Sequence, residues 1–101
     1  MITDEYFSIS APAEGMFKDR GSAFHAFAYP VSDQETIKLL IKQIKKTHYE
    51  CNHHCYAFRL GQGGHIYRSS DDREPAGSAG KPILVQLLSH NLSDILIVVS
   101  R

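Results

Sequence analysis

The first 30 residues alternate between hydrophobic and polar positions, which is the pattern of a half-buried strand. The alternation runs over residues 6–16 and returns over residues 22–29, after the turn-forming sequence KDRG at 18–21. Pro12 cannot donate a backbone hydrogen bond, so it favours an edge position or a bulge for the first strand. The two stretches together predict a β-hairpin.

The hydrophobic spacing changes to that of a helix after residue 32. Ser32 and Glu35 have the spacing of a capping box, and apolar residues then recur every three or four positions. We expect a helix over about Asp33–His48. Its opposite side carries four lysines, which either contact phosphates or simply face solvent: Lys38, Lys42, Lys45 and Lys46.

The second half of the chain predicts another hairpin, a helix and a strand. Residues 55–60 and 65–70 flank the sequence GQGG, whose glycines favour a tight turn. Apolar residues at helical spacing follow Pro82, and the apolar run Ile95–Val99 is typical of a strand covered on both faces. The predicted fold class is α+β: a mainly antiparallel sheet of four or five strands with two helices on one face.

The composition of the chain limits what it can do. Its 101 residues allow a single domain, and a hydrophobic content of 43% is enough for a modest core. Eleven basic and eleven acidic residues give a formal net charge of zero, so any binding of nucleic acid would have to be local. The N-terminus has no basic segment followed by an apolar one. We therefore expect a cytoplasmic protein without a membrane segment, whose two cysteines are thiols.

The segment DDREPAGSAGKPIL, residues 71–84, holds the densest group of chemically active side chains. Pro82 suits the first position of a helix, so the preceding loop should end on a helix N-terminus, which attracts anions. Its three acids could hold a divalent cation, but capping of a turn through backbone N–H groups is favoured. We treat the polar residues and glycines as a candidate binding loop: Asp71, Asp72, Glu74, Gly77, Ser78, Gly80 and Lys81.

Two catalytic motifs nearly match this loop. A phosphate-binding loop needs a glycine where Pro75 stands and a hydroxyl where Pro82 stands, so that motif is excluded. Ser78 and Lys81 have the S-x-x-K spacing of penicillin-binding enzymes. That chemistry needs both residues on one helical turn, which Gly80 and Pro82 disfavour, so a serine hydrolase is not favoured.

A second cluster of reactive side chains follows the first helix. Its potential zinc ligands fit the spacing of no standard zinc finger: His48, Cys51, His53, His54 and Cys55. A cysteine nucleophile paired with His53 is the other chemical interpretation. Packing is favoured over both, because a buried cysteine behaves as a small hydrophobic residue. No metal and no cofactor is predicted.

At residues 71–84 the chain resembles the N-terminal domain of the IMPACT (imprinted ancient) family, whose bacterial members are called YigZ-like. The family pattern is D-D-G-E-P-x-G-T-A-G-x-P-[IM]-L, and the chain departs from it at Arg73, where glycine is usual, and at Ser78, where threonine is usual. The matching residues are Asp71, Asp72, Glu74, Pro75, Gly77, Ala79, Gly80, Pro82, Ile83 and Leu84. The resemblance spans nearly the whole chain, since it also takes in Gly21-Ser22-x-Phe24, His53-x-Cys55-Tyr56-Ala57 and Val98-Val99-x-Arg101.

The resemblance implies a fold like the second domain of the fifth small-subunit ribosomal protein, and a domain over residues 1–101 that is incomplete at its C-terminal end. It also implies a non-catalytic regulatory binding module linked to translation, with a protein, the ribosome or RNA as partner. The alternative is a metal-assisted enzyme, or a nucleotide- or phosphate-binding protein, that uses Asp71, Asp72 and Glu74. We expect the loop to be supported by three residues outside it: His53, Cys55 and Arg101. The oligomeric state is left open.

Overall fold

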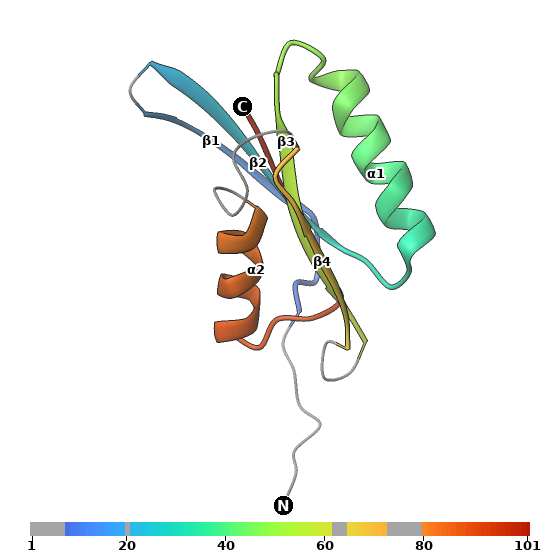
Figure 1. The fold of residues 1–101 in the computed structure, drawn as a ribbon. Helices are drawn as coiled ribbons and strands as arrows, with labels where there is room; N and C mark the ends of the chain where they lie inside the picture. The colour runs from blue at the N-terminus through green and yellow to red at the C-terminus, as the bar shows by residue number, and fades with distance from the viewer. Residues whose placement is uncertain (1–7, 20, 62–64, 73–79) are drawn as a thin grey trace, which may run out of the picture.

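The fold is a single five-stranded sheet with one helix on each face (Figure 1). The computed structural model describes residues 8–19, 21–61, 65–72 and 80–101. The elements in chain order are β1 (Ala13–Asp19), β2 (Ser22–Pro30), α1 (Gln34–Thr47), β3 (His54–Leu60), β4 (Ile66–Ser70), α2 (Gly80–Ser89) and β5 (Ile95–Ser100).

The last strand of the chain lies at the centre of the sheet. The strand order is β1-β2-β5-β3-β4, and every neighbouring pair is antiparallel. In the register, Phe27 of β2 lies opposite Val98 of β5, and Phe58 of β3 lies opposite Leu96. β5 therefore joins two hairpins: β1-β2, which the alternating pattern predicted, and β3-β4, which the glycine-rich turn predicted. The α+β class and the antiparallel sheet are confirmed.

The two helices lie on opposite faces of this sheet, so the prediction that they share one face was wrong. The reason is visible along β5, because successive side chains of a strand point to opposite faces. Leu96 and Val98 belong to the cluster that packs against α1, whereas Ile95 and Ile97 pack with residues of α2. The continuous apolar run of this strand reflects burial on both sides, as the sequence indicated.

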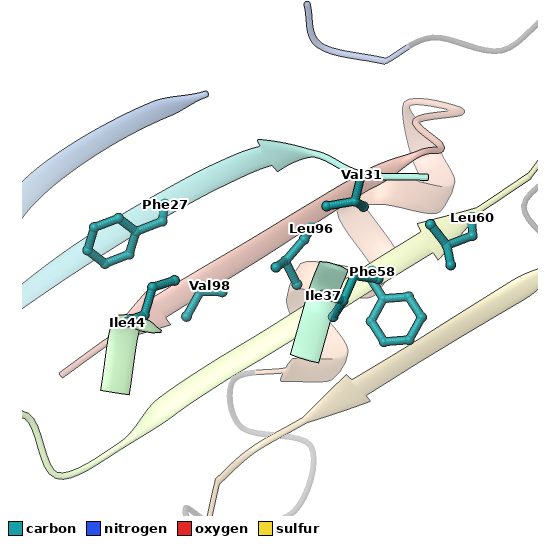
Figure 2. Close-up of a cluster of buried hydrophobic side chains, with 8 residues drawn as sticks. All are labelled: Phe27, Val31, Ile37, Ile44, Phe58, Leu60, Leu96 and Val98. Atoms are coloured by element: carbon teal, nitrogen blue, oxygen red, sulfur yellow. The ribbon is translucent and has the colours of Figure 1, made fainter. Parts of the chain in front are cut away.

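The larger core lies between α1 and the sheet. Figure 2 shows its side chains from β2, β3 and β5 gathered around the two α1 residues, Ile37 and Ile44, that are 2% and 4% exposed. Burial of each such side chain contributes about 1.5–3 kcal/mol. The residues drawn are Phe27, Val31, Ile37, Ile44, Phe58, Leu60, Leu96 and Val98.

Three predicted boundaries differ from the structure. β1 begins at Ala13 rather than near residue 6, and Pro12 directly precedes it. α1 has the expected extent, but its N-cap is Asp33, whose carboxylate accepts the backbone N–H of Thr36 at 2.7 Å. The capping box predicted from Ser32 is therefore wrong by one residue. A carboxylate at the N-cap also suits the positive end of the helix dipole.

The third difference concerns the start of α2. This helix begins at Gly80, so Pro82 is its third residue and not its first. The position is still compatible with proline, because the N–H groups of the first turn have no partner within the helix. Neither helix of the described residues is long and apolar enough to cross a membrane.

Candidate functional site

Asp71 ties the loop after β4 to the beginning of α2. Its Oδ1 accepts the backbone N–H of Gly80 at 2.7 Å, and its carbonyl oxygen accepts the thiol of Cys55 at 3.2 Å. The N–H of Gly80 is one of those that a helix cannot satisfy internally. The anion that the helix start attracts is thus a carboxylate of the same chain.

Asp72 links the end of the β3-β4 hairpin back to the beginning of β3. Its Oδ2 accepts the backbone N–H of His54 at 2.7 Å, and its carbonyl oxygen accepts His53 Nδ1 at 2.8 Å. Its own N–H donates to Ser70 Oγ at 3.3 Å. The residue has a φ of 44°, in the left-handed region, which aspartate tolerates better than most residues.

Gly80 brings α2 close to the end of β4. A Cβ built on this residue would lie 2.7 Å from both the backbone C and N of Ser70, so no larger residue fits without a shift. The glycine at this position is therefore explained by the close approach of the chain's own backbone.

We call the candidate binding loop after β4 the acidic loop. The part of it that the structure describes is fixed by hydrogen bonds to the chain's own backbone and so has a structural role. Both half-buried carboxylates, of Asp71 and Asp72, accept backbone N–H groups. Lys81 is exposed on α2. Glu74, Gly77 and Ser78 lie outside the described residues.

Two of the three expected supports, His53 and Cys55, lie on one side of the extended segment that leads into β3. His53 and Cys55 both contact the loop backbone, as alternation along a strand requires of residues two positions apart. Arg101 acts through its main chain: its N–H donates to the carbonyl of His53 at 2.8 Å, and its carbonyl accepts the N–H of Asn52 at 2.7 Å. Its guanidinium lies 6.0 Å from the ring centroid of Phe24, within reach of a cation–π contact.

The remaining histidines face the other way. His54 is buried, and its Nδ1 lies 2.7 Å from Ser100 Oγ on the neighbouring β5. Burial lowers the pKa of His54 below its ordinary value, with the charge of Asp72 opposing that effect. His48 caps the C-terminus of α1, where its ring packs on that of His25, tilted by 35° and with centroids 5.1 Å apart.

The potential zinc ligands of the sequence are thus divided between two faces of the sheet. Among the residues that the structure describes, no group of three or more histidine, cysteine or acidic side chains is placed to hold a metal ion. Both cysteines are thiols, and burial, aided by the charge of Glu50, raises the pKa of the Cys51 thiol. A raised thiol pKa lowers the fraction of the nucleophilic thiolate.

A cationic groove lies on the α1 face of the molecule. Three of the four lysines identified in the sequence line a hollow of about 360 Å³, together with Ile41 and Tyr56. A smaller hollow of about 90 Å³ adjoins it and reaches Phe58 and Arg68 on the sheet. We call this surface the lysine groove and define it by Lys38, Ile41, Lys42, Lys45, Tyr56 and Arg68.

The charge of the lysine groove has one sign. Its three lysines and Arg68 are exposed, and no carboxylate is among the described residues that line either hollow. A chain of zero net charge thus carries a local concentration of positive charge. Lys46, which the sequence placed on the same surface, is exposed but does not line the groove.

The structure does not bring the lysine groove and the acidic loop together. His53 and Cys55, which hold the loop, alternate along the chain with His54 and Tyr56, so the two surfaces use opposite faces of β3. The sequence analysis identified the lysines but missed Tyr56 and Arg68 as groove residues. Strand alternation offered a signal, because it places Tyr56 on the same face as Phe58.

A family model and curated relatives of this chain name the same family. The model of the Impact N-terminal domain matches residues 20–101. The IMPACT family member YvyE of Bacillus subtilis is 34% identical over 96 residues, which are 95% of this chain and 44% of the relative. The IMPACT family member YigZ of Escherichia coli is 32% identical over 94 residues, which are 91% of this chain and 46% of the relative. The chain therefore spans less than half the length of these curated relatives.

A solved structure matches the fold over the same extent. It is described as a crystal structure of a hypothetical protein, and it superposes with a TM-score of 0.87 at 32% sequence identity. The match covers 91% of this chain and 46% of that chain.

Proposed function

The chain belongs to the Impact N-terminal domain family, and from this premise we propose that it is a non-catalytic binding module that contacts nucleic acid through the lysine groove. The observation that carries the proposal is a row of exposed cations that line two adjoining hollows with Tyr56, with no carboxylate among the described lining residues. Contact with nucleic acid is in keeping with the link to translation that the family resemblance implies, and with the cytoplasmic location expected from the N-terminal sequence.

The contacts of the acidic loop support a non-catalytic role. A metal-binding or general-base carboxylate needs oxygen atoms that are open to a ligand, whereas one oxygen each of Asp71 and Asp72 already accepts the N–H group of Gly80 or His54. The Cys55 thiol donates to the carbonyl of Asp71. These contacts give the loop a structural task and count against the metal-assisted alternative.

The lysine groove has the chemistry that binds a phosphate backbone. Lysine ammonium groups neutralise phosphates, and the counterions released on binding supply most of the affinity for nucleic acid. None of the three lysines forms an ion pair with any carboxylate that the structure describes. Binding of phosphates therefore does not require an internal salt bridge to be broken first.

The proposal predicts a particular dependence on salt. If three or four groove cations each neutralise a phosphate, the slope of log K against log salt concentration should be about −2 to −3 for a single strand. Affinity should then fall roughly 20- to 50-fold between 50 and 200 mM salt. Fluorescence anisotropy of a labelled RNA, titrated with the protein at several salt concentrations, measures this slope.

Charge reversal in the groove tests where the RNA binds. The double variant Lys42→Glu/Lys45→Glu should reduce the magnitude of the slope by about 1.4, since two phosphate contacts are lost. A matched control, Lys18→Glu/Lys81→Glu, makes the same change of net charge on β1 and α2, and should bind like wild type. Thermal melts of all proteins verify that they are folded.

Two results would contradict the proposal. Equal loss of binding in both double variants would show that overall charge and not the groove attracts RNA. If RNA alone binds weakly and an acidic polypeptide displaces it from the groove, the groove serves an acidic protein partner.

A further inference from the structure

We infer that the lysine groove takes an unpaired nucleic-acid strand, with one base stacked on Tyr56 and the adjacent phosphates on Lys42 and Lys45. This inference rests on the proposed function and specifies the ligand of the same site. It depends on three features of the groove: a fixed aromatic ring, the spacing of the lysines, and an apolar part of the lining.

The ring of Tyr56 is held in place before any ligand binds. It lies nearly parallel to the ring of Phe58, at an interplanar angle of 7° and with centroids 6.4 Å apart. Phe58 is only 4% exposed and belongs to the core beneath α1 (Figure 2). Tyr56 is itself half-buried against this core, so little side-chain entropy remains to be lost when a base stacks on it.

The lysines follow the groove at intervals suited to a strand. Lys38, Lys42 and Lys45 are four and three residues apart, which places them on one side of α1 about 6 and 4.5 Å apart along its axis. Flexible lysine side chains at such intervals can reach consecutive phosphates of an extended strand. Arg68 adds a fourth cation where the smaller hollow reaches the sheet.

The apolar part of the groove lining favours an exposed base over a base pair. Tyr56 and Ile41 line the groove next to the cations. A base in a duplex is already stacked on its neighbours, whereas an unpaired base can stack on an aromatic side chain. Every base has an aromatic face, so binding of this kind should be tolerant of sequence.

Two tyrosine substitutions with opposite expectations provide the test. Tyr56→Leu keeps an apolar side chain in the core but removes the aromatic ring, and should weaken binding of a short single strand at least five-fold. Tyr56→Phe keeps the ring and should bind within about two-fold of wild type. Tyr67→Leu is the matched control, because Tyr67 is exposed on β4 and lies opposite Arg59 of β3, on the face away from α1.

The probes are one sequence as single-stranded RNA, as single-stranded DNA and as the corresponding duplexes. A single strand of either sugar type should bind at least ten-fold more tightly than its duplex, and a fluorescent purine analogue in the strand should be quenched by wild type but not by Tyr56→Leu. Duplex binding as tight as that of single strands, or a Tyr56→Leu variant that binds like wild type, overturns the inference. In those cases a loss of nucleic-acid binding in the Lys42→Glu/Lys45→Glu variant would still support the groove as a nucleic-acid site.

Discussion

Replacement of Asp72 by alanine should destabilise the protein strongly, because this residue combines three structural tasks. Its carboxylate accepts the N–H of His54, its carbonyl accepts the ring of His53, and its backbone is left-handed with a φ of 44°. The substitution Asp72→Ala removes the first contact and places a residue that disfavours the left-handed region in that conformation.

The magnitude follows from these two losses. An N–H left without a partner in a buried setting costs about 1–3 kcal/mol, and His54 is only 5% exposed. A left-handed alanine adds about 1 kcal/mol. The free energy of unfolding should therefore fall by about 2–4 kcal/mol, which for a chain of this size lowers the melting temperature by about 4–8 °C for each kcal/mol.

Two further variants separate the contributions. Asp72→Asn keeps an oxygen acceptor and tolerates the left-handed region, so we expect it to lose less than about 1 kcal/mol. Asp72→Gly removes the acceptor without the backbone penalty, and should therefore be more stable than Asp72→Ala. Urea denaturation followed by circular dichroism, with and without magnesium, measures all three against wild type.

If the acidic loop were a cation site, Asp72→Ala would have the opposite effect on stability. Crowded carboxylates that await a cation destabilise the empty protein, so their removal would leave stability unchanged or raise it. A more stable Asp72→Ala variant, together with a magnesium-dependent stabilisation that only wild type shows, would refute the scaffold interpretation of this loop.

Three other perturbations test the packing and the buried charge balance. Gly80→Ala should cost about 1–3 kcal/mol, because the new Cβ meets the backbone of Ser70; an unchanged urea midpoint would contradict that close approach. Leu96→Ala should cost about 2–5 kcal/mol, since this side chain is 0% exposed, while Leu39→Ala, at an exposed position, should change stability little; similar losses in both would contradict the assigned core. The pKa of His54 is lowered by burial, so the unfolded chain binds its proton first. The free energy of unfolding should fall as the pH drops below about 6.5, and above that pH it should not depend on this group. If a His54→Gln variant loses as much free energy of unfolding as wild type between pH 7 and pH 5, this reasoning is refuted.

The elements of the fold could be predicted because each buries one face. Strand alternation and helical spacing arise from side-chain geometry, so they identified the first hairpin and both helices, while the GQGG turn identified the second hairpin and the apolar run the last strand. The placement of the helices was missed, although the apolar run Ile95–Val99 already required cover on both faces. That requirement was inconsistent with the prediction of both helices on one face. In the structure the helices cover opposite faces, as the apolar run required.

The roles of the acidic residues depended on contacts that no local pattern shows. Asp71 binds an N–H nine residues later, and Asp72 binds one 18 residues earlier, on another strand. A pair of carboxylates in a loop has the same sequence whether it binds backbone or a cation, so only the fold distinguishes the two.

The sequence predicted only the helical side of the lysine groove. Helical periodicity placed Lys38, Lys42 and Lys45 on one side of α1 from the sequence alone, and the structure has them line one hollow. Tyr56 and Arg68 join them from β3 and β4, through a helix-to-sheet packing that the spacing within either element does not determine.

The most direct test of the lysine groove as a nucleic-acid site is a map of the protein's amide NMR shifts during titration with a short single-stranded RNA. The largest shift changes should occur in α1 between Lys38 and Lys45 and on the sheet at Tyr56 and Arg68, while Asp72 and Gly80 on the opposite side remain unchanged. Changes concentrated at Asp72 and Gly80, or no change at saturating RNA, would contradict the account.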